Sequence, residues 1–145
     1  MPNRSQGYVH RQQGLRPQSQ AMATCYKRNQ RESTVTFCRA HQQTLVRVLL
    51  ESQSKQGFDC LGIATDPTHV HTVVAWRDER RARRLRVAIK SSLSRGMNTA
   101  FSRRSWLSEG GSCKRLRDQR HLDYLLEHYL PKHSGLVWIA GRGFL

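Results

Sequence analysis

The sequence predicts one α+β domain in which helices cover an antiparallel sheet. Two neighbouring stretches rich in β-branched residues are separated by a short turn, and longer stretches with apolar residues at helical spacing lie on both sides of them. The length of 145 residues and a hydrophobic content of 37% suit a single domain with one core. We therefore expect a folded domain over residues 33–145, preceded by an arm over residues 1–32.

The first ordered elements are expected to be a strand and a helix. Residues 34–38 alternate β-branched and other side chains, which predicts a short strand. Residues 39–55 carry leucines and valines at helical spacing, and Gly57 is placed to end this helix.

A β-hairpin is expected to follow the first helix. Residues 58–65 and 69–76 both have the composition of strands, and Asp66 and Pro67 between them favour a tight turn. The two strands should therefore pair in antiparallel fashion.

The remaining elements complete the expected order. Residues 77–95 predict a basic amphipathic helix, and residues 113–117 a short edge strand. Asp118 is a candidate N-cap for a final helix that begins near Gln119. The order strand, helix, strand, strand, helix, strand is ferredoxin-like, and the last helix would be an addition at the C-terminal end.

The charge of the chain points to a polyanionic partner. Twenty-five Lys and Arg against ten Asp and Glu give a net charge of +15 and a pI near 11, which is typical of nucleic-acid-binding proteins. Residues 1–32 are rich in Gln and Arg and are expected to form a mobile basic arm, which either solvates the domain or lies along phosphates. The candidate DNA-binding residues lie on the second helix: Arg80, Arg81, Arg83, Arg84, Arg86, Lys90 and Arg95.

The sequence also indicates the compartment. No apolar run approaches the ~18 residues of a membrane-spanning helix, and the N-terminal stretch lacks the apolar region of a secretory signal. The cysteines, Cys25, Cys38, Cys60 and Cys113, are widely spaced without a C-x-x-C pair, so we expect them to be reduced. These features predict a cytoplasmic protein.

The sequence His69-Val70-His71 is the first candidate for chemistry. Because side chains alternate along a strand, the two histidines should project from one face, about 7 Å apart along the chain. Val74 and Trp76 would share the opposite, apolar face with Val70. The motif alone fits either a metal-binding pair or two ordinary polar-face histidines.

The last helix carries two tyrosine–histidine pairs at four-residue spacing. Counted at ~100° per residue from Leu122, Tyr129 and His133 share the inward face with it, whereas Tyr124 and His128 point outward. Tyr129 is thus either a packing residue or a nucleophile beside the histidines.

These motifs resemble the HUH single-tyrosine transposases, in particular the REP-associated tyrosine transposases. The resemblance covers residues 33–138 and rests on the His-Val-His strand, the basic helix and the Tyr-x-x-x-His helix. It implies that His69, His71 and His133 bind a divalent metal, Mg²⁺ or Mn²⁺. It also implies that Tyr129 attacks single-stranded DNA flanking a hairpin and keeps the 5′-phosphate as a phosphotyrosine.

Two classes of function remain open from the sequence. One is a DNA nicking and joining enzyme of a prokaryotic, nucleoid-associated type, with Tyr129 or, alternatively, Tyr124 with His128 as the catalytic pair. The other is a non-catalytic basic domain, such as a domesticated transposase, that binds DNA or RNA hairpins. In either case we expect a monomer or homodimer that does not bind membranes.

Overall fold

A computed structural model describes residues 35–109 and 111–145 of the chain, so the expected arm lies outside the described residues. The helical elements are α3 (Arg39–Gln56), α4 (Ala82–Ala100), α5 (Gln119–Tyr124), the π-helical η1 (Leu125–Tyr129) and the 3-10 turn η2 (Leu130–Lys132). The strands are β1 (Asp59–Thr65), β2 (Val70–Ala75), β3 (Val137–Ile139) and β4 (Gly143–Phe144). The expected α+β class is confirmed.

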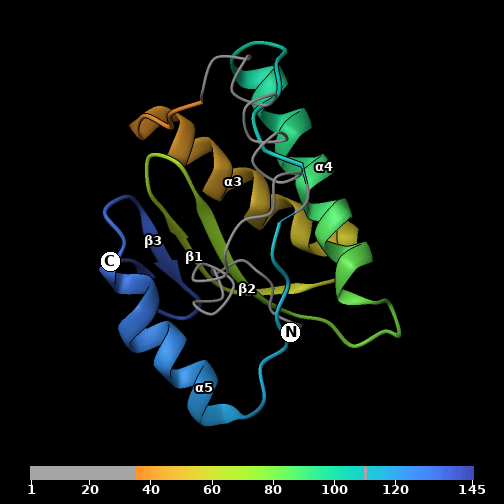
Figure 1. Ribbon diagram of the computed structural model, residues 1–145, viewed down its shortest axis with the longest axis vertical. Coiled ribbons are helices and arrows are strands. Elements are labelled where there is room, and N and C mark those ends of the chain that lie inside the picture. The colour runs from red at the N-terminus through yellow and green to blue at the C-terminus, as the bar shows by residue number, and fades with distance from the viewer. Residues whose placement is uncertain (1–34, 110) are drawn as a thin grey trace, which may run out of the picture.

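The four strands form one antiparallel sheet in the order β2-β1-β3-β4 (Figure 1). The pairing of β1 with β2 runs from Asp59 opposite Ala75 to Thr65 opposite Val70, which confirms the expected hairpin. On its other side β1 pairs with β3, which places the end of the chain beside the hairpin.

Each face of the sheet packs against its own apolar cluster. On one face Ile63 is buried among core residues of α3 and α4, with Val74 packed against them. On the other face Ala64 and Val73 are buried with Leu130 of η2. The sheet therefore lies between the α3–α4 pair and the continuous helical run from α5 to η2, and Figure 1 shows α5 well apart from α3 and α4.

Gly62 allows the α5–η2 run to lie close to β1. A Cβ atom at this position would come within 2.7 Å of Leu130 Cδ1 and 2.9 Å of Leu126 Cδ2. The strand register also shifts between Cys60 and Gly62. A side chain here would push the helical run away from the sheet.

The strand expected over residues 34–38 is wrong for residues 35–38, and residue 34 lies outside the described part. Instead of forming a ladder, Phe37 N donates a single backbone hydrogen bond to Pro67 O (2.7 Å). Gln42 Nε2 donates to Phe37 O (3.0 Å), so a side chain takes the place of a neighbouring strand. The β-branched residues here lead into α3 and bury Phe37 in the core.

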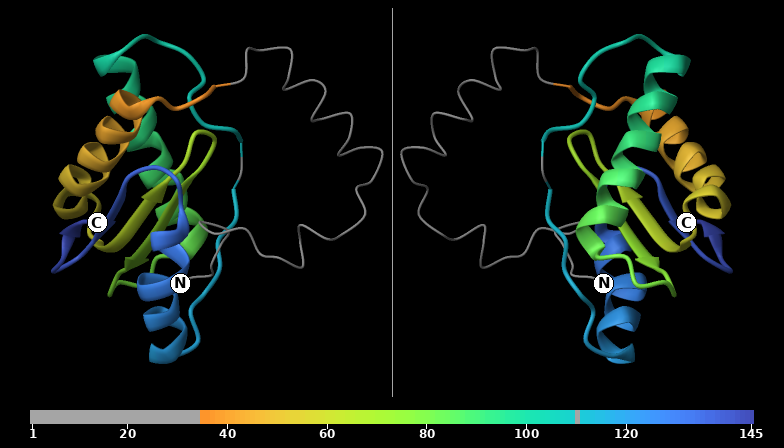
Figure 2. Two further views of the ribbon diagram at one scale, coloured as in Figure 1. Left: turned by 90° about the vertical axis from the view of Figure 1, so that its left-hand side faces the viewer. Right: turned by 90° about the vertical axis from the view of Figure 1, so that its right-hand side faces the viewer.

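The edge strand expected over residues 113–117 is also wrong, because only Lys114 makes a bridge of the β type. Seen from the side, the chain after α4 runs past the sheet to α5 (Figure 2). Side chains of α4 hold this segment, with Arg86 donating to Gly111 O (2.7 Å) and Lys90 to Ser108 O.

The final helix begins where expected, because Asp118 Oδ1 accepts a hydrogen bond from His121 N (2.9 Å). It is not the last element, since β3 and β4 follow it. With two expected strands missing and two short ones added, a ferredoxin-like arrangement is not confirmed. The second helix starts later than expected, at Ala82, because Arg80 is held in a turn by Asp78.

Among the described residues, Cys38, Cys60 and Cys113 form no disulfide bond with one another, and Cys25 lies outside the described residues.

Candidate metal and tyrosine site

The turn of the hairpin holds a carboxylate in a fixed position. Asp66 Oδ1 accepts hydrogen bonds from Thr68 N (2.9 Å) and His69 N (2.7 Å), and Asp66 N donates to His69 O (3.0 Å). Partial burial opposes ionisation of this carboxyl, but the hydrogen bonds from Thr68 and His69 outweigh it and lower the pKa of Asp66. The carboxylate is thus ionised and oriented before any ligand binds.

The two histidines of the hairpin lie on one face, with ring centroids 5.9 Å apart. They differ in surroundings. His71 on β2 is only 6% exposed, whereas the His69 side chain is 57% exposed. Thr68 Oγ1 lies 2.7 Å from His69 Nδ1, which draws this ring toward the turn.

The helical run after Asp118 changes from α-helix to π-helix and then to a 3-10 turn before it reaches His133. In η1 the N–H of Leu130 donates to Leu125 O, five residues back, and η2 then tightens into a 3-10 turn. Pro131 stands at the start of η2, where its missing N–H does not break an α-helix. Tyr129 and His133 lie on the same side of this run, with ring centroids 5.1 Å apart.

The orientation of His133 favours one ring nitrogen as a metal ligand. Its Nδ1 lies 3.0 Å from Leu130 O, and a carbonyl can only accept, so Nδ1 carries the proton. In the neutral ring this leaves the lone pair on Nε2. Such a second hydrogen bond is the usual way in which proteins fix the tautomer of a metal-binding histidine.

The hairpin and the helical run meet at His71. Its ring centroid lies 4.3 Å from that of His133 and 5.9 Å from that of Tyr129. Asp66, His71 and His133 each offer one ligand atom, and these atoms all lie within 4.8 Å of one another. The three residues form a group that can hold a metal ion, with Tyr129 beside it.

A buried polar network fixes the two halves of this site to each other. Thr65 Oγ1 donates to Gln42 Oε1 (2.9 Å) and accepts from Leu136 N (2.7 Å). Thr65 N donates to Leu136 O (2.8 Å), and Gly135 N to Thr65 O (2.8 Å). The end of β1, next to Asp66, is thus held against the segment that follows His133.

Of the sequence-derived candidates, the structure brings His71, Tyr129 and His133 together and leaves His69 at the edge. The sequence predicts a turn role alone for Asp66. Its position three residues before His69, directly after a strand, is a signal that could have pointed to it, because a hairpin turn keeps its flanking side chains close to one another.

The alternative pair is on the outside of the helical run. The rings of Tyr124 and His128 lie 5.8 Å apart, and Tyr124 is 42% exposed. This matches the outward face expected from the helical count.

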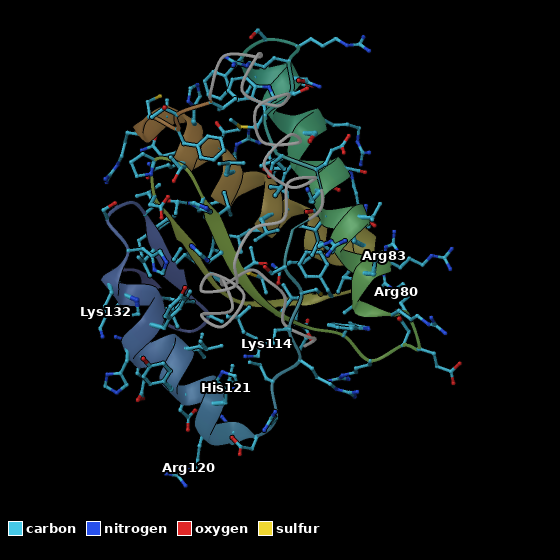
Figure 3. The ribbon with its side chains drawn as sticks, in the orientation of Figure 1. Arg80, Arg83, Lys114, Arg120, His121 and Lys132 are labelled. Atoms are coloured by element: carbon cyan, nitrogen blue, oxygen red, sulfur yellow. The ribbon has the colours of Figure 1, made fainter. Side chains whose placement is uncertain are left out.

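The basic residues of α4 and the turn before it fall into two groups. Arg80, Arg86 and Lys90 bind the protein itself, through Asp78 and Gly57 O, Gly111 O and Ser108 O respectively. The side chains of Arg81, Arg83 and Arg84 are exposed, and Arg95 lies near Ser92 Oγ (3.4 Å). Figure 3 shows Arg80 and Arg83 on the opposite side of the molecule from Lys132, the neighbour of His133.

In the described part of the chain, every helix falls short of the length and apolar character that crossing a membrane requires. The chain matches no known protein family, no curated protein and no solved structure.

Proposed function

We propose that this protein is a metal-dependent single-stranded DNA endonuclease and strand transferase that acts next to DNA hairpins. Tyr129 is its nucleophile, and Asp66, His71 and His133 hold its metal. The proposal is supported by the resemblance of the His-Val-His and Tyr-x-x-x-His motifs to HUH single-tyrosine transposases.

The observation that carries the proposal is the position of Tyr129. Its ring lies 5.9 Å from that of His71 and 5.1 Å from that of His133, beside a group of ligand atoms within 4.8 Å of one another. Tyr129 also packs against the apolar cluster around Leu130, but packing alone does not require two imidazole rings beside its own ring.

The donor set suits the metal that the resemblance implies. Two imidazoles and one carboxylate are ligands that Mn²⁺ and similar transition ions accept, whereas Mg²⁺ prefers oxygen ligands alone. We therefore favour Mn²⁺ of the two. A divalent ion held there would polarise the scissile phosphate and offset the charge that develops on it.

The chain's own contribution to the reaction is the Tyr129 hydroxyl. Its oxygen forms a bond to phosphorus while the bond from phosphorus to the 3′-oxygen breaks. The phenolic proton leaves Tyr129, and the departing strand gains a proton to end in a 3′-hydroxyl. A 3′-hydroxyl can later displace the tyrosine from the same phosphorus, so the strands rejoin without ATP.

The test is a covalent adduct on a defined tyrosine. A labelled single-stranded hairpin DNA with unpaired flanks is incubated with Mn²⁺ and the protein, then run on a denaturing gel, and the DNA-linked peptide is identified by mass spectrometry. We expect an adduct on Tyr129 that is lost in Tyr129→Phe and kept in Tyr124→Phe.

Each other result is informative. An adduct on Tyr124 would keep the enzyme class and reverse the assignment of the nucleophile. Loss of every adduct alongside tight hairpin binding would favour the second candidate, a binding-only domain. The exposed arginines at the start of α4 favour that candidate, because they need no metal to bind phosphate.

A further inference from the structure

A hollow at the start of α4 concentrates positive charge. It is lined by Glu79, Arg80, Arg81, Arg83, Arg84 and Val87. Residues 77–86 hold six arginines and only two acidic residues. Guanidinium groups at this density repel one another and create a positive potential that attracts anions.

The protein itself supplies little of that charge. Arg80 is held by Asp78, whose carboxylate lies 2.8 Å away, and by Gly57 O (2.9 Å). Within the described residues, by contrast, the guanidinium groups of Arg81, Arg83 and Arg84 make neither a hydrogen bond nor an ion pair. Three of the four lining arginines therefore point into solvent.

Their place on the helix adds to the imbalance. The first turn of a helix carries a partial positive charge and normally favours Asp or Glu. The first turn of α4 has no acidic residue, and its N-cap, Arg81, makes no side-chain capping bond. Arginines here cost stability in the free protein, and departures from local preference of this kind are expected at functional sites.

We propose that this hollow binds the phosphate backbone of nucleic acid, as a surface separate from the metal and tyrosine site. Guanidinium groups match phosphate oxygens with paired N–H donors. Val87, 54% exposed among the arginines, offers an apolar contact to the sugars between phosphates. That the nucleic acid is single-stranded hairpin DNA rests on the proposed function.

The position of the hollow gives it a distinct role. Arg80 and Arg83 lie on the far side of the molecule from Lys132 (Figure 3), so this surface does not touch the reacting phosphate. It anchors a part of the DNA remote from the scissile bond.

The test compares two charge-matched double variants. Arg83→Gln/Arg84→Gln removes two charges from the hollow, and Arg39→Gln/Arg142→Gln removes two exposed charges elsewhere. Binding of fluorescent hairpin DNA is measured in EDTA over a salt series, so that no cleavage interferes.

For the hollow variant we expect the slope of log K against log salt to become less negative by about 1.4, and the affinity near 0.1 M salt to fall about 25-fold. The melting temperature of the hollow variant should equal or exceed that of the wild type. The substitutions remove positive side chains from the first turn of α4, where they oppose the helix dipole. The control variant should change affinity less than about threefold.

Equal losses in both variants would overturn the proposal, since net charge alone would then explain binding. Polyglutamate of matched charge competing as well as DNA would also overturn it in favour of an acidic peptide. If the hollow variant alone lost DNA affinity and the wild-type protein never cleaved DNA, this inference would stand and the proposed function would be refuted.

Discussion

The ring centroids of His71 and His133 lie 4.3 Å apart. His71 belongs to the hairpin, which precedes α4 in the sequence, and His133 ends the helical run from α5 to η2, which follows α4. His71 is buried and His133 is partly exposed. This contact joins the two halves of the candidate site, and the carboxylate of Asp66 completes the set of ligand atoms.

Metal should stabilise the fold through these three residues. At a Mn²⁺ concentration about 100 times its dissociation constant, the free energy of unfolding should rise by about 2.7 kcal/mol. We expect His71→Ala and His133→Ala to abolish this gain in thermal unfolding, and His128→Ala, on the outward face, to keep it. An undiminished gain in His71→Ala would show that the metal binds elsewhere.

The variant His69→Ala tests whether His69 is a ligand of the metal. Its ring is drawn toward Thr68, and the three clustered ligand atoms come from Asp66, His71 and His133. We therefore expect His69→Ala to retain most of the Mn²⁺ stabilisation that His71→Ala loses. Complete loss in His69→Ala would instead place His69 among the ligands.

Gly62→Ala should disturb the tyrosine site through packing alone. The added Cβ would lie 2.7 Å from Leu130 Cδ1, so we expect a loss of about 1–3 kcal/mol in stability and a weaker Mn²⁺ effect. Gly96→Ala is the matched control, because its Cβ would meet Val48 Cγ2 at 2.5 Å between α3 and α4. In urea unfolding, Gly96→Ala should lose a comparable amount of stability but keep the stabilisation by Mn²⁺. If both variants lost the Mn²⁺ stabilisation equally, the effect of Gly62→Ala on the metal site would not be local.

Cys60 should resist alkylation while the protein is folded. Burial raises the pKa of Cys60 from 9.0 to about 12, and a backbone hydrogen bond of Gly62 lowers it only in part. The pKa of Cys60 is higher in the folded than in the unfolded state, so its thiol contributes fully to the free energy of unfolding below pH 9. This contribution is lost as the pH rises from 9 toward 12.

Iodoacetamide at pH 8 followed by peptide mapping checks this difference in reactivity. Exposed Cys38 should be modified in the native protein, and Cys60 only after addition of urea. Equal labelling of both thiols under native conditions would contradict the burial of Cys60.

Much of the local structure could be read from the sequence because short-range signals determine it. Gly57 ends α3 with a φ of 73°, and Asp118 caps α5 through its carboxylate. The hairpin follows from two β-branched runs and an Asp-Pro turn. In each case neighbouring residues alone decide the conformation.

The missing parts depend on residues far away in the chain. Residues 35–38 have strand composition, yet Gln42 and Pro67 satisfy the backbone of Phe37. The strand β3 has only three residues, so its pattern is too short to recognise. The sequence does not identify Asp66 as a candidate metal ligand, because it does not show that the segment with His133 lies beside the hairpin turn.

The network around Thr65 ties the candidate site to the order in which the chain folds. Leu136 is 71 residues from Thr65 and 94 from Gln42 along the chain, and closing such long loops is entropically costly. An intermediate with only α3, β1, β2 and α4 would have the turn carboxylate in place without the second imidazole. Metal affinity should therefore appear only with the last long-range contacts, so a metal pulse during refolding would report completion of the native state.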